Sequence, residues 1–113
     1  MKTIIAGGRN FNDYKLLVRE CRKRLFEISE IVSGCANGAD KLGEKFANDY
    51  DVPIKKFPAD WNKFGKSAGY IRNEEMAKYA DALIAFWDGQ SKGTKHMIDL
   101  AHKHKLNVTV INY

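Results

Sequence analysis

The stretch Ala82-Leu83-Ile84-Ala85-Phe86-Trp87, followed by Asp88-Gly89-Gln90-Ser91-Lys92-Gly93-Thr94, decides the fold class. Six apolar residues without a polar interruption predict a strand buried on both faces, as in a parallel sheet. The polar, glycine-containing segment after it predicts a turn. Met97, Ile98 and Ala101 then recur at helical spacing, so a helix follows. A strand, a turn and a helix in this order form the repeating unit of an α/β fold.

The same alternation occurs earlier in the chain. Ile4-Ile5-Ala6 ends at two glycines and predicts a buried first strand. The next segment predicts a helix capped by Asn12 or Asp13. Its apolar residues recur at helical spacing; they are Leu17, Val18, Cys21, Leu25 and Ile28. Ile31-Val32 predicts a second strand. The helix after it has the cleanest amphipathic pattern of the chain, with one face made of Ala39, Leu42, Gly43, Phe46, Ala47 and Tyr50.

The remaining segments complete five strands. Residues 53–57 predict a third strand, whose lysines favour a position near the sheet edge. Pro58 to Gly69 is expected to be a loop, Ile71 to Ala80 a helix and Val108 to Ile111 the last strand. The expected architecture is α/β: a single Rossmann-like three-layer domain over residues 1–113, with a five-stranded, mostly parallel sheet.

Composition limits the kinds of partner. The chain has 113 residues and a formal net charge of +5, with an isoelectric point near 9.2, which suits an anionic partner such as a phosphorylated small molecule or nucleic acid. Two cysteines do not make a disulfide framework, and both are expected to be reduced. No apolar run approaches the length of a membrane span and no signal peptide is evident, so we expect a cytoplasmic protein without a membrane partner. A homo-oligomer is left open.

Three loops that follow strands indicate where a ligand would bind. In open parallel sheets ligands lie beyond the carboxyl ends of the strands, where the strand order reverses. Gly7-Gly8-Arg9 follows the first strand, residues 33–40 follow the second, and residues 89–94 follow the fourth. Glycine lets the backbone approach a ligand closely, and a helix start favours phosphate. Thr94 is expected to cap its helix or to contact a phosphate oxygen, with Lys92 adding positive charge.

Five short motifs in order resemble a known family. They are Gly7-Gly8-Arg9-Asn10-Phe11, Ser33-Gly34-Cys35-Ala36-Asn37-Gly38-Ala39-Asp40, Pro58-Ala59-Asp60-Trp61, Gly69-Tyr70-Ile71-Arg72-Asn73 and Ser91-Lys92-Gly93-Thr94. Together they resemble the YspA-like branch of the SLOG superfamily, which includes the LOG phosphoribohydrolases and the DNA-processing protein A domain. The resemblance covers nearly the whole chain. It implies a Rossmann-like sheet that binds nucleotides or molecules derived from them, in bacteria or their phages.

The chain departs from that pattern at chemically important positions. Cys35 replaces a glycine and Asn37 replaces an arginine that would contact anions. The LOG enzymes carry a glutamate on the helix after Gly-Thr, where this chain has Met97; Asp99 would point elsewhere on the helix. A methionine neither stabilises an oxocarbenium ion nor moves a proton. The resemblance therefore does not carry hydrolase activity over.

Fifteen residues are predicted to bind the ligand: Gly7, Gly8, Arg9, Gly34, Cys35, Gly38, Asp40, Asp60, Trp61, Arg72, Asn73, Gly89, Lys92, Gly93 and Thr94. Several have a structural alternative. Asp40 either accepts a ribose hydroxyl or stabilises a helix start. The two arginines either hold phosphate or form surface ion pairs. Trp61 either stacks on a base or packs at the edge of the core. Asn73 either contacts the base or ribose or caps a turn.

Three functions remain open at this point. The preferred one is binding of a nucleotide or nucleotide-derived, phosphate-containing small molecule, as a sensor or sequestering protein. The first alternative is hydrolysis of an N-glycosidic or phosphate bond in such a molecule, for which Asp40 or Asp60 would supply a carboxylate. The second is a DNA-binding module. No catalytic residue, cofactor or metal ligand is assigned, and the spacing of His96, His102 and His104 is not that of a metal site.

Overall fold

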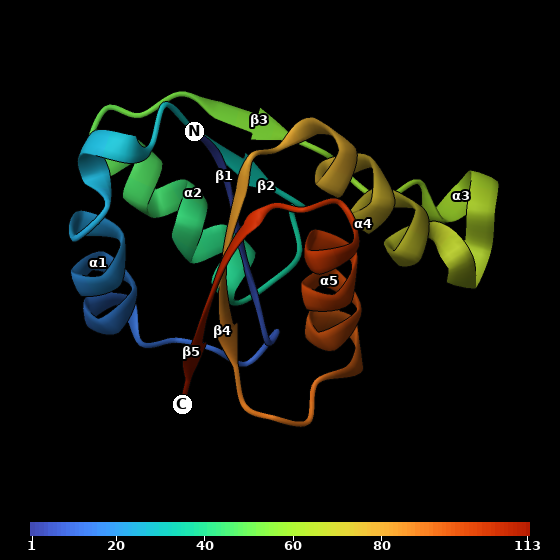
Figure 1. Cartoon of the computed structure of the whole chain (residues 1–113). Coiled ribbons are helices and arrows are strands. Elements are labelled where there is room, and N and C mark those ends of the chain that lie inside the picture. Colours follow the sequence, from blue (N-terminus) through green and yellow to red (C-terminus); the bar gives the residue numbers. More distant parts are fainter.

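The computed structural model describes residues 1–113 and has five parallel strands in one sheet. The strands are β1 (Lys2–Gly7), β2 (Glu30–Ser33), β3 (Ile54–Lys56), β4 (Ala82–Trp87) and β5 (Asn107–Asn112), and their order across the sheet is β3-β2-β1-β4-β5 (Figure 1). All four pairings are parallel, with Ile4 beside Val32 on one side and Leu83 on the other. The predicted α/β class and five-stranded sheet are confirmed.

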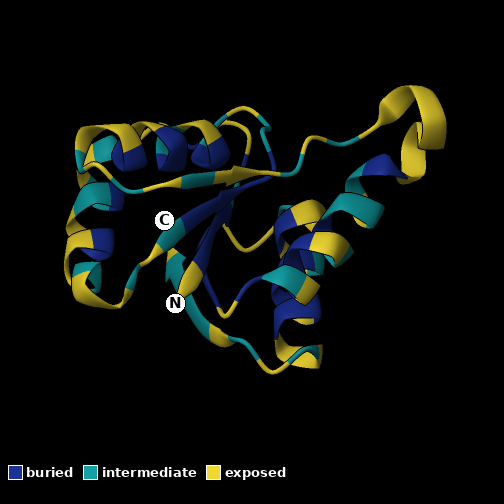
Figure 2. Cartoon of the chain, turned by 90° about the horizontal axis from the view of Figure 1, so that it is seen from above, coloured by how far each residue is buried: buried dark blue, intermediate teal, exposed yellow.

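Helices cover both faces of the sheet. They are α1 (Tyr14–Arg22), α2 (Ala39–Asp49), α3 (Trp61–Phe64), α4 (Ala68–Tyr79) and α5 (Lys92–Lys103), with 3-10 turns at Leu25–Glu27 and Gly65–Ser67. Helices α1 and α2 pack on one face, α4 and α5 on the other, and α3 extends beyond the end of α4 (Figure 1). Figure 2 shows that α3 is exposed, whereas the central strands β1, β2 and β4 are mostly buried.

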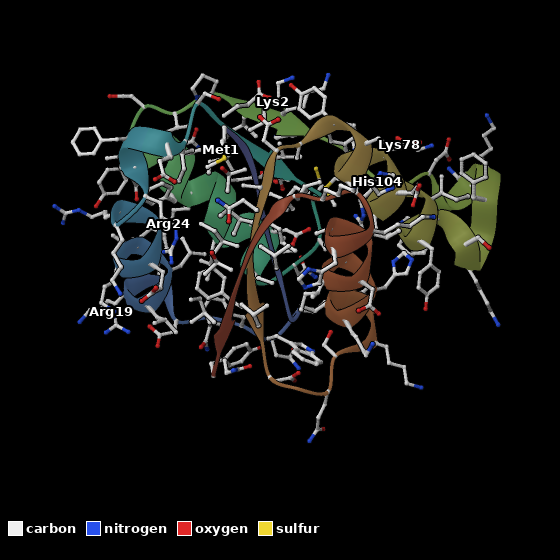
Figure 3. The ribbon with its side chains drawn as sticks, in the orientation of Figure 1. Met1, Lys2, Arg19, Arg24, Lys78 and His104 are labelled. Carbon is white, nitrogen blue, oxygen red and sulfur yellow. The ribbon has the colours of Figure 1, made fainter.

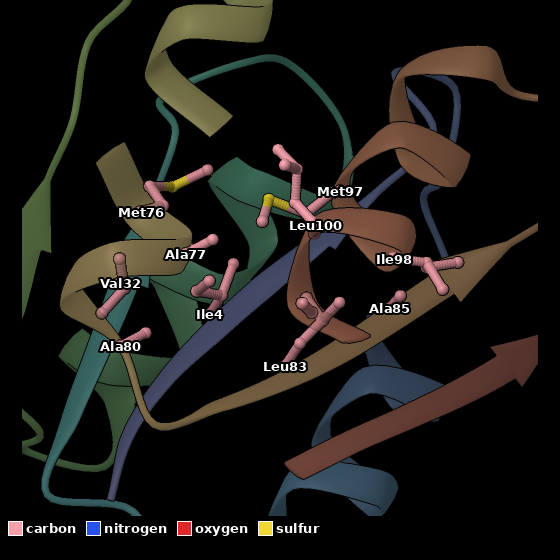
Figure 4. Close-up of a cluster of buried hydrophobic side chains, with 12 residues drawn as sticks. Ile4, Val32, Met76, Ala77, Ala80, Leu83, Ala85, Met97, Ile98 and Leu100 are labelled. Atoms are coloured by element: carbon pink, nitrogen blue, oxygen red, sulfur yellow. The ribbon is translucent and has the colours of Figure 1, made fainter. Parts of the chain in front are cut away.

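Each central strand supplies side chains to two cores because successive side chains point to opposite faces. Ile4 and Leu83 join Met76 and Met97 in the core under α4 and α5 (Figure 4). The next residues along these strands, Ile5 and Ile84, face the core under α1 and α2. This division explains why the strands are continuously apolar in sequence.

The first predicted helix is too long. Helix α1 ends at Arg22, and the backbone then tightens into i→i−3 hydrogen bonds, from Arg24 to Cys21 and from Glu27 to Arg24. Ile28 is extended, since the chain must turn back to start β2 beside β1. Leu25 and Ile28 still pack against the core. The apolar spacing therefore identified which residues face the core, but the helix it predicted was too long.

Two further boundaries differ from expectation. Residues 61–69 are mostly helical rather than a loop, because the Asp60 carboxylate caps α3 by accepting the Lys63 amide at 3.0 Å, and α4 begins at Ala68. Helix α5 starts at Lys92, so its N-cap is Ser91 and not Thr94. The Asp13 cap of α1 is confirmed: its carboxylate accepts the Leu16 amide at 3.0 Å. The prediction of an edge position for β3 is also confirmed.

Candidate functional site

A cleft of about 440 Å³ opens where β1 and β4 end. These neighbouring strands are connected to opposite sides of the sheet: the chain after β1 leads towards β2, and the chain after β4 leads to β5. This is the point of strand-order reversal at which open α/β sheets bind their ligands. The loop after β1, the start of α2, the middle of α4 and the start of α5 all contribute to its wall.

The glycine loops on the β1 and β2 side are held together by close backbone packing. Gly38 has a φ of +80°, and a side chain there would overlap the carbonyl groups of Gly8 and Arg9. A Cβ at Gly7 would lie 2.5 Å from the Phe86 carbonyl oxygen. These glycines therefore let the two loops and β4 approach one another. Gly7 and Gly8 line the cleft, whereas Gly38 does not and instead packs against the backbone of Gly8 and Arg9.

At the start of α5, unlike at Gly7 and Gly38, the glycine has open space beside it. Gly93 lines it, and a Cβ built at Gly93 would meet no atom within 4 Å. Ser91 caps the helix, accepting the Thr94 amide at 3.4 Å, and the two hydroxyl oxygens are 3.0 Å apart. An open helix N-terminus with the positive end of its dipole favours an anion. Gly89 and Lys92 do not line the cleft; both are exposed beside it.

Asp40 and Arg72 form the charged part of the wall. The Asp40 side chain is buried and accepts the Ala36 amide at 3.2 Å. Burial raises the pKa of Asp40 from 3.8 to about 6, against the opposing effects of that hydrogen bond and of Arg72. A Cβ at Gly34 would lie 2.8 Å from the Asp40 carboxylate and 2.9 Å from the Arg72 guanidinium, so a larger residue there would displace these two side chains.

Arg72 is held in place and Arg9 is exposed. Arg72 Nη1 donates to the Gly34 carbonyl oxygen, and its Nε donates to Asn73 Oδ1 at 3.0 Å. Neither Arg72 nor Arg9 forms a salt bridge. In contrast, Arg19 and Arg24, on the α1 side of the molecule (Figure 3), both pair with Glu20. The cleft thus has two arginines whose charge no carboxylate neutralises directly.

Asn73 links the cleft to α5. It is buried, and its Nδ2 lies 3.1 Å from His96 Nδ1. The His96 ring packs edge-on against Tyr70 at 4.6 Å, and burial lowers the pKa of His96. A neutral imidazole accepts the amide hydrogen, which leaves Asn73 fixed at the cleft wall. His104 contacts Glu74 instead, and no group of three His, Cys, Asp or Glu residues is placed to hold a metal ion.

A second hollow of about 250 Å³ shares Arg9, Ala36 and Arg72 with the cleft. We call it the Trp61 hollow, after the half-exposed indole on its wall. The other residues that line it are Gly34, Cys35, Asn37, Pro58 and Ala59. Cys35 has a φ of +65°, in the left-handed region that a glycine adopts without strain. Its amide donates to Ser33 Oγ at 3.1 Å, which supports that conformation.

The structure gathers most of the predicted residues around these two cavities, with exceptions. Asp60 lines neither, because its carboxylate is used as the α3 cap. The sequence argument missed Asn10, Ala36, Met76, Asp88, Ser91 and Tyr113, all of which line the cleft. Asp88, which accepts the Gln90 and Ser91 amides at 2.8 Å, could have been found as a polar residue directly after a strand. Tyr113 also directly follows a strand, β5, and its ring packs edge-on against Phe11, with the ring centroids 4.8 Å apart.

Comparison with known families and proteins identifies relatives over the whole chain. The model of the family described as "YspA, cpYpsA-related SLOG family" matches residues 1–64. The Gene 61 protein of Mycobacterium phage D29 is 32% identical over 122 residues, covering 99% of this chain and 95% of that protein. An arginine–tRNA ligase of Novosphingobium aromaticivorans is 39% identical over 57 residues, which are half of this chain and only 10% of the ligase.

A solved structure has the same fold. DNA processing protein A from Helicobacter pylori, described for its single-stranded DNA binding mode, superposes with a TM-score of 0.69 at 18% identity. The superposition covers all of this chain and 66% of that one, so the chain spans just under two thirds of its length. At this identity the likeness concerns the fold.

None of the helices here is both long and apolar enough to cross a membrane.

Proposed function

This chain belongs to the YspA- and cpYpsA-related SLOG family, and from that premise we propose that its cleft binds a nucleotide or a nucleotide-derived small molecule through phosphate. The observation that carries the proposal is the convergence of the open α5 N-terminus at Gly93 with two unpaired arginines at the strand-order reversal. Backbone N–H groups and guanidinium forks are the groups that recognise phosphate oxygens. The cleft volume of about 440 Å³ lies in the range of small-molecule sites.

The experiment is a thermal-shift and calorimetry panel of adenine and guanine nucleotides with the wild type and a Gly93→Val variant. A ligand at one hundred times its Kd stabilises the fold by about 2.7 kcal/mol. Gly93→Val fills the phosphate position without meeting another protein atom at its Cβ, so the variant is expected to fold and to lose binding. Gln90→Val is the matched control, since it places the same side chain at an exposed, uncharged residue in the turn before the same helix, outside the cleft. If no nucleotide raises the melting temperature at millimolar concentration, the proposal is refuted. If Gly93→Val binds as tightly as the wild type, the ligand does not bind at Gly93.

We propose that the cleft retains its ligand, as in a sensor or sequestering protein. Met97 lies buried in the cleft wall where the LOG enzymes have a glutamate. Asp60 is turned away, which leaves Asp40 and Asp88 as the carboxylates of the cleft. Asp88 accepts two backbone amides of its own turn, and its pKa is lowered by them. Asp40 is therefore the one residue here that a hydrolytic alternative would depend on.

Single-stranded DNA is a second candidate ligand, favoured by the charge of +5 and by the fold shared with DNA processing protein A. The exposed Trp61 lies on the same short helix as Lys63, an arrangement that suits stacking beside a phosphate backbone. Binding through several phosphates would weaken steeply as salt rises. The nucleotide proposal expects only non-specific DNA affinity at about 150 mM salt, with a Kd weaker than micromolar.

A further inference from the structure

The phosphate argument above does not use Trp61 or the space beside its indole, yet the Trp61 hollow shares residues with the cleft. The two cavities share three residues, and two of these are Arg9 and Arg72. A volume of about 250 Å³ is below the range of independent small-molecule sites, whereas the same space joined to the cleft fits an extended ligand. The shared arginines lie at the junction of the two cavities. An anionic part of the ligand would bind there, with one end group in the cleft and the other in the Trp61 hollow.

Arg72 is suited to the junction because its orientation is fixed. The Gly34 carbonyl and Asn73 each accept one of its N–H groups, so the other three guanidinium hydrogens remain for a ligand. Arg72 also favours the ionised form of Asp40, which is buried and lines the cleft. Arg9 approaches the junction from the loop after β1 and is exposed. Two guanidinium groups from separate elements therefore line the same junction, and guanidinium groups bind phosphate oxygens through paired N–H donors.

Trp61 provides the end wall of the hollow. Its side chain is 51% exposed and takes part in no aromatic stack or cation–π pair in the protein. A Cβ at Gly69 would be 3.6 Å from both the indole Cη2 and Arg72 Nη2, so ring and guanidinium are neighbours across that glycine. The helix that carries the indole projects from the body of the protein (Figures 1 and 2). An indole with a free face beside a phosphate-binding group is the arrangement on which a base stacks.

We propose that the ligand is a molecule with two ring-bearing nucleoside-like units joined by a diphosphate, one unit in the cleft and the other against Trp61. The inference rests on the proposed function, since the first unit occupies the cleft described above. It predicts that a nucleoside diphosphate, which fills only the cleft and the junction, is an incomplete ligand.

The test compares probes that differ only in the second unit. ADP and diadenosine diphosphate, and GDP and diguanosine diphosphate, are titrated by calorimetry into the wild type. ADP carries more negative charge than its dinucleotide, so phosphate attraction alone favours ADP. Tighter binding of a dinucleotide, by about 5- to 150-fold as expected for one stacked base, supports the proposal.

Variants then show which residue provides the extra affinity of the dinucleotide. Trp61→Ala is expected to reduce dinucleotide affinity to that of the nucleoside diphosphate, which itself changes by less than about twofold, and Trp61→Phe should restore most of the gain. Arg9→Ala should weaken both members of a pair by about 10- to 150-fold, the loss of a charged hydrogen bond. Equal affinities within both pairs, or a gain that survives in Trp61→Ala, would overturn the two-unit ligand while the proposed function stands. Failure of all four probes to bind would overturn both.

Discussion

Replacing Asp40 by asparagine tests whether the cleft really contains a buried carboxyl whose ionisation is unfavourable. The substitution keeps the shape of the side chain and an oxygen that accepts the Ala36 amide, but it removes the titration. Burial raises the pKa of Asp40 from 3.8 to about 6 in the folded protein. At 1.36 kcal/mol for each pKa unit, keeping Asp40 ionised costs the fold about 3 kcal/mol.

The direction of the pH dependence follows from linkage. A carboxyl whose pKa is higher in the folded than in the unfolded state contributes stability that is complete below the unfolded pKa, and this contribution is lost as the pH rises through about 6. We therefore expect the free energy of unfolding of the wild type to fall by about 2–3 kcal/mol relative to Asp40→Asn between pH 4 and pH 8.

Urea denaturation of both proteins at pH 4, 5, 6, 7 and 8 measures this difference, with equal m-values required at each pH. Asp99→Asn is the matched control, because it removes the same charge from a carboxylate that is 61% exposed. We expect its effect to stay within about 0.5 kcal/mol across the range. Parallel profiles of the wild type and Asp40→Asn would refute the argument that Asp40 is desolvated in the cleft.

Three further outcomes test the packing and the chemistry of the site. Gly38→Ala should destabilise the fold by more than about 2 kcal/mol in urea denaturation, because the residue has a φ of +80° and its Cβ would overlap Gly8; a change below about 0.5 kcal/mol would contradict the loop packing. Incubation with AMP, GMP, CMP and UMP should release no free base detectable by chromatography, because Met97 supplies no charge beside the sugar; turnover that disappears in Asp40→Asn would make the protein an enzyme. Binding to a labelled single-stranded oligonucleotide should weaken steeply with salt, and tight binding that resists salt would promote DNA to the principal ligand.

The sequence alone determined the α/β class and the regular elements with strong apolar patterns. The run from Ala82 to Trp87 is buried on both faces, so its hydrophobicity is continuous and its bounds as a strand were recovered. Helix α2 was equally clear, since its buried face follows the helical period. The loops after strands were predicted for a topological reason, because parallel strands end at one edge of the sheet.

The tertiary structure decided what the local pattern left ambiguous. Leu25 and Ile28 pack partly buried against the core without being part of α1. The chain leaves the helix at Arg22 because it must turn back to start β2 beside β1. Asp60 was predicted to bind the ligand, but the tertiary structure forms the short helix α3 and uses the Asp60 carboxylate as its cap. The arrangement of Asp40, Arg72 and Trp61 required the packing of α4 against the β2 loop. Contacts between residues more than thirty positions apart, such as Arg72 with Gly34, leave no periodic signal in the sequence.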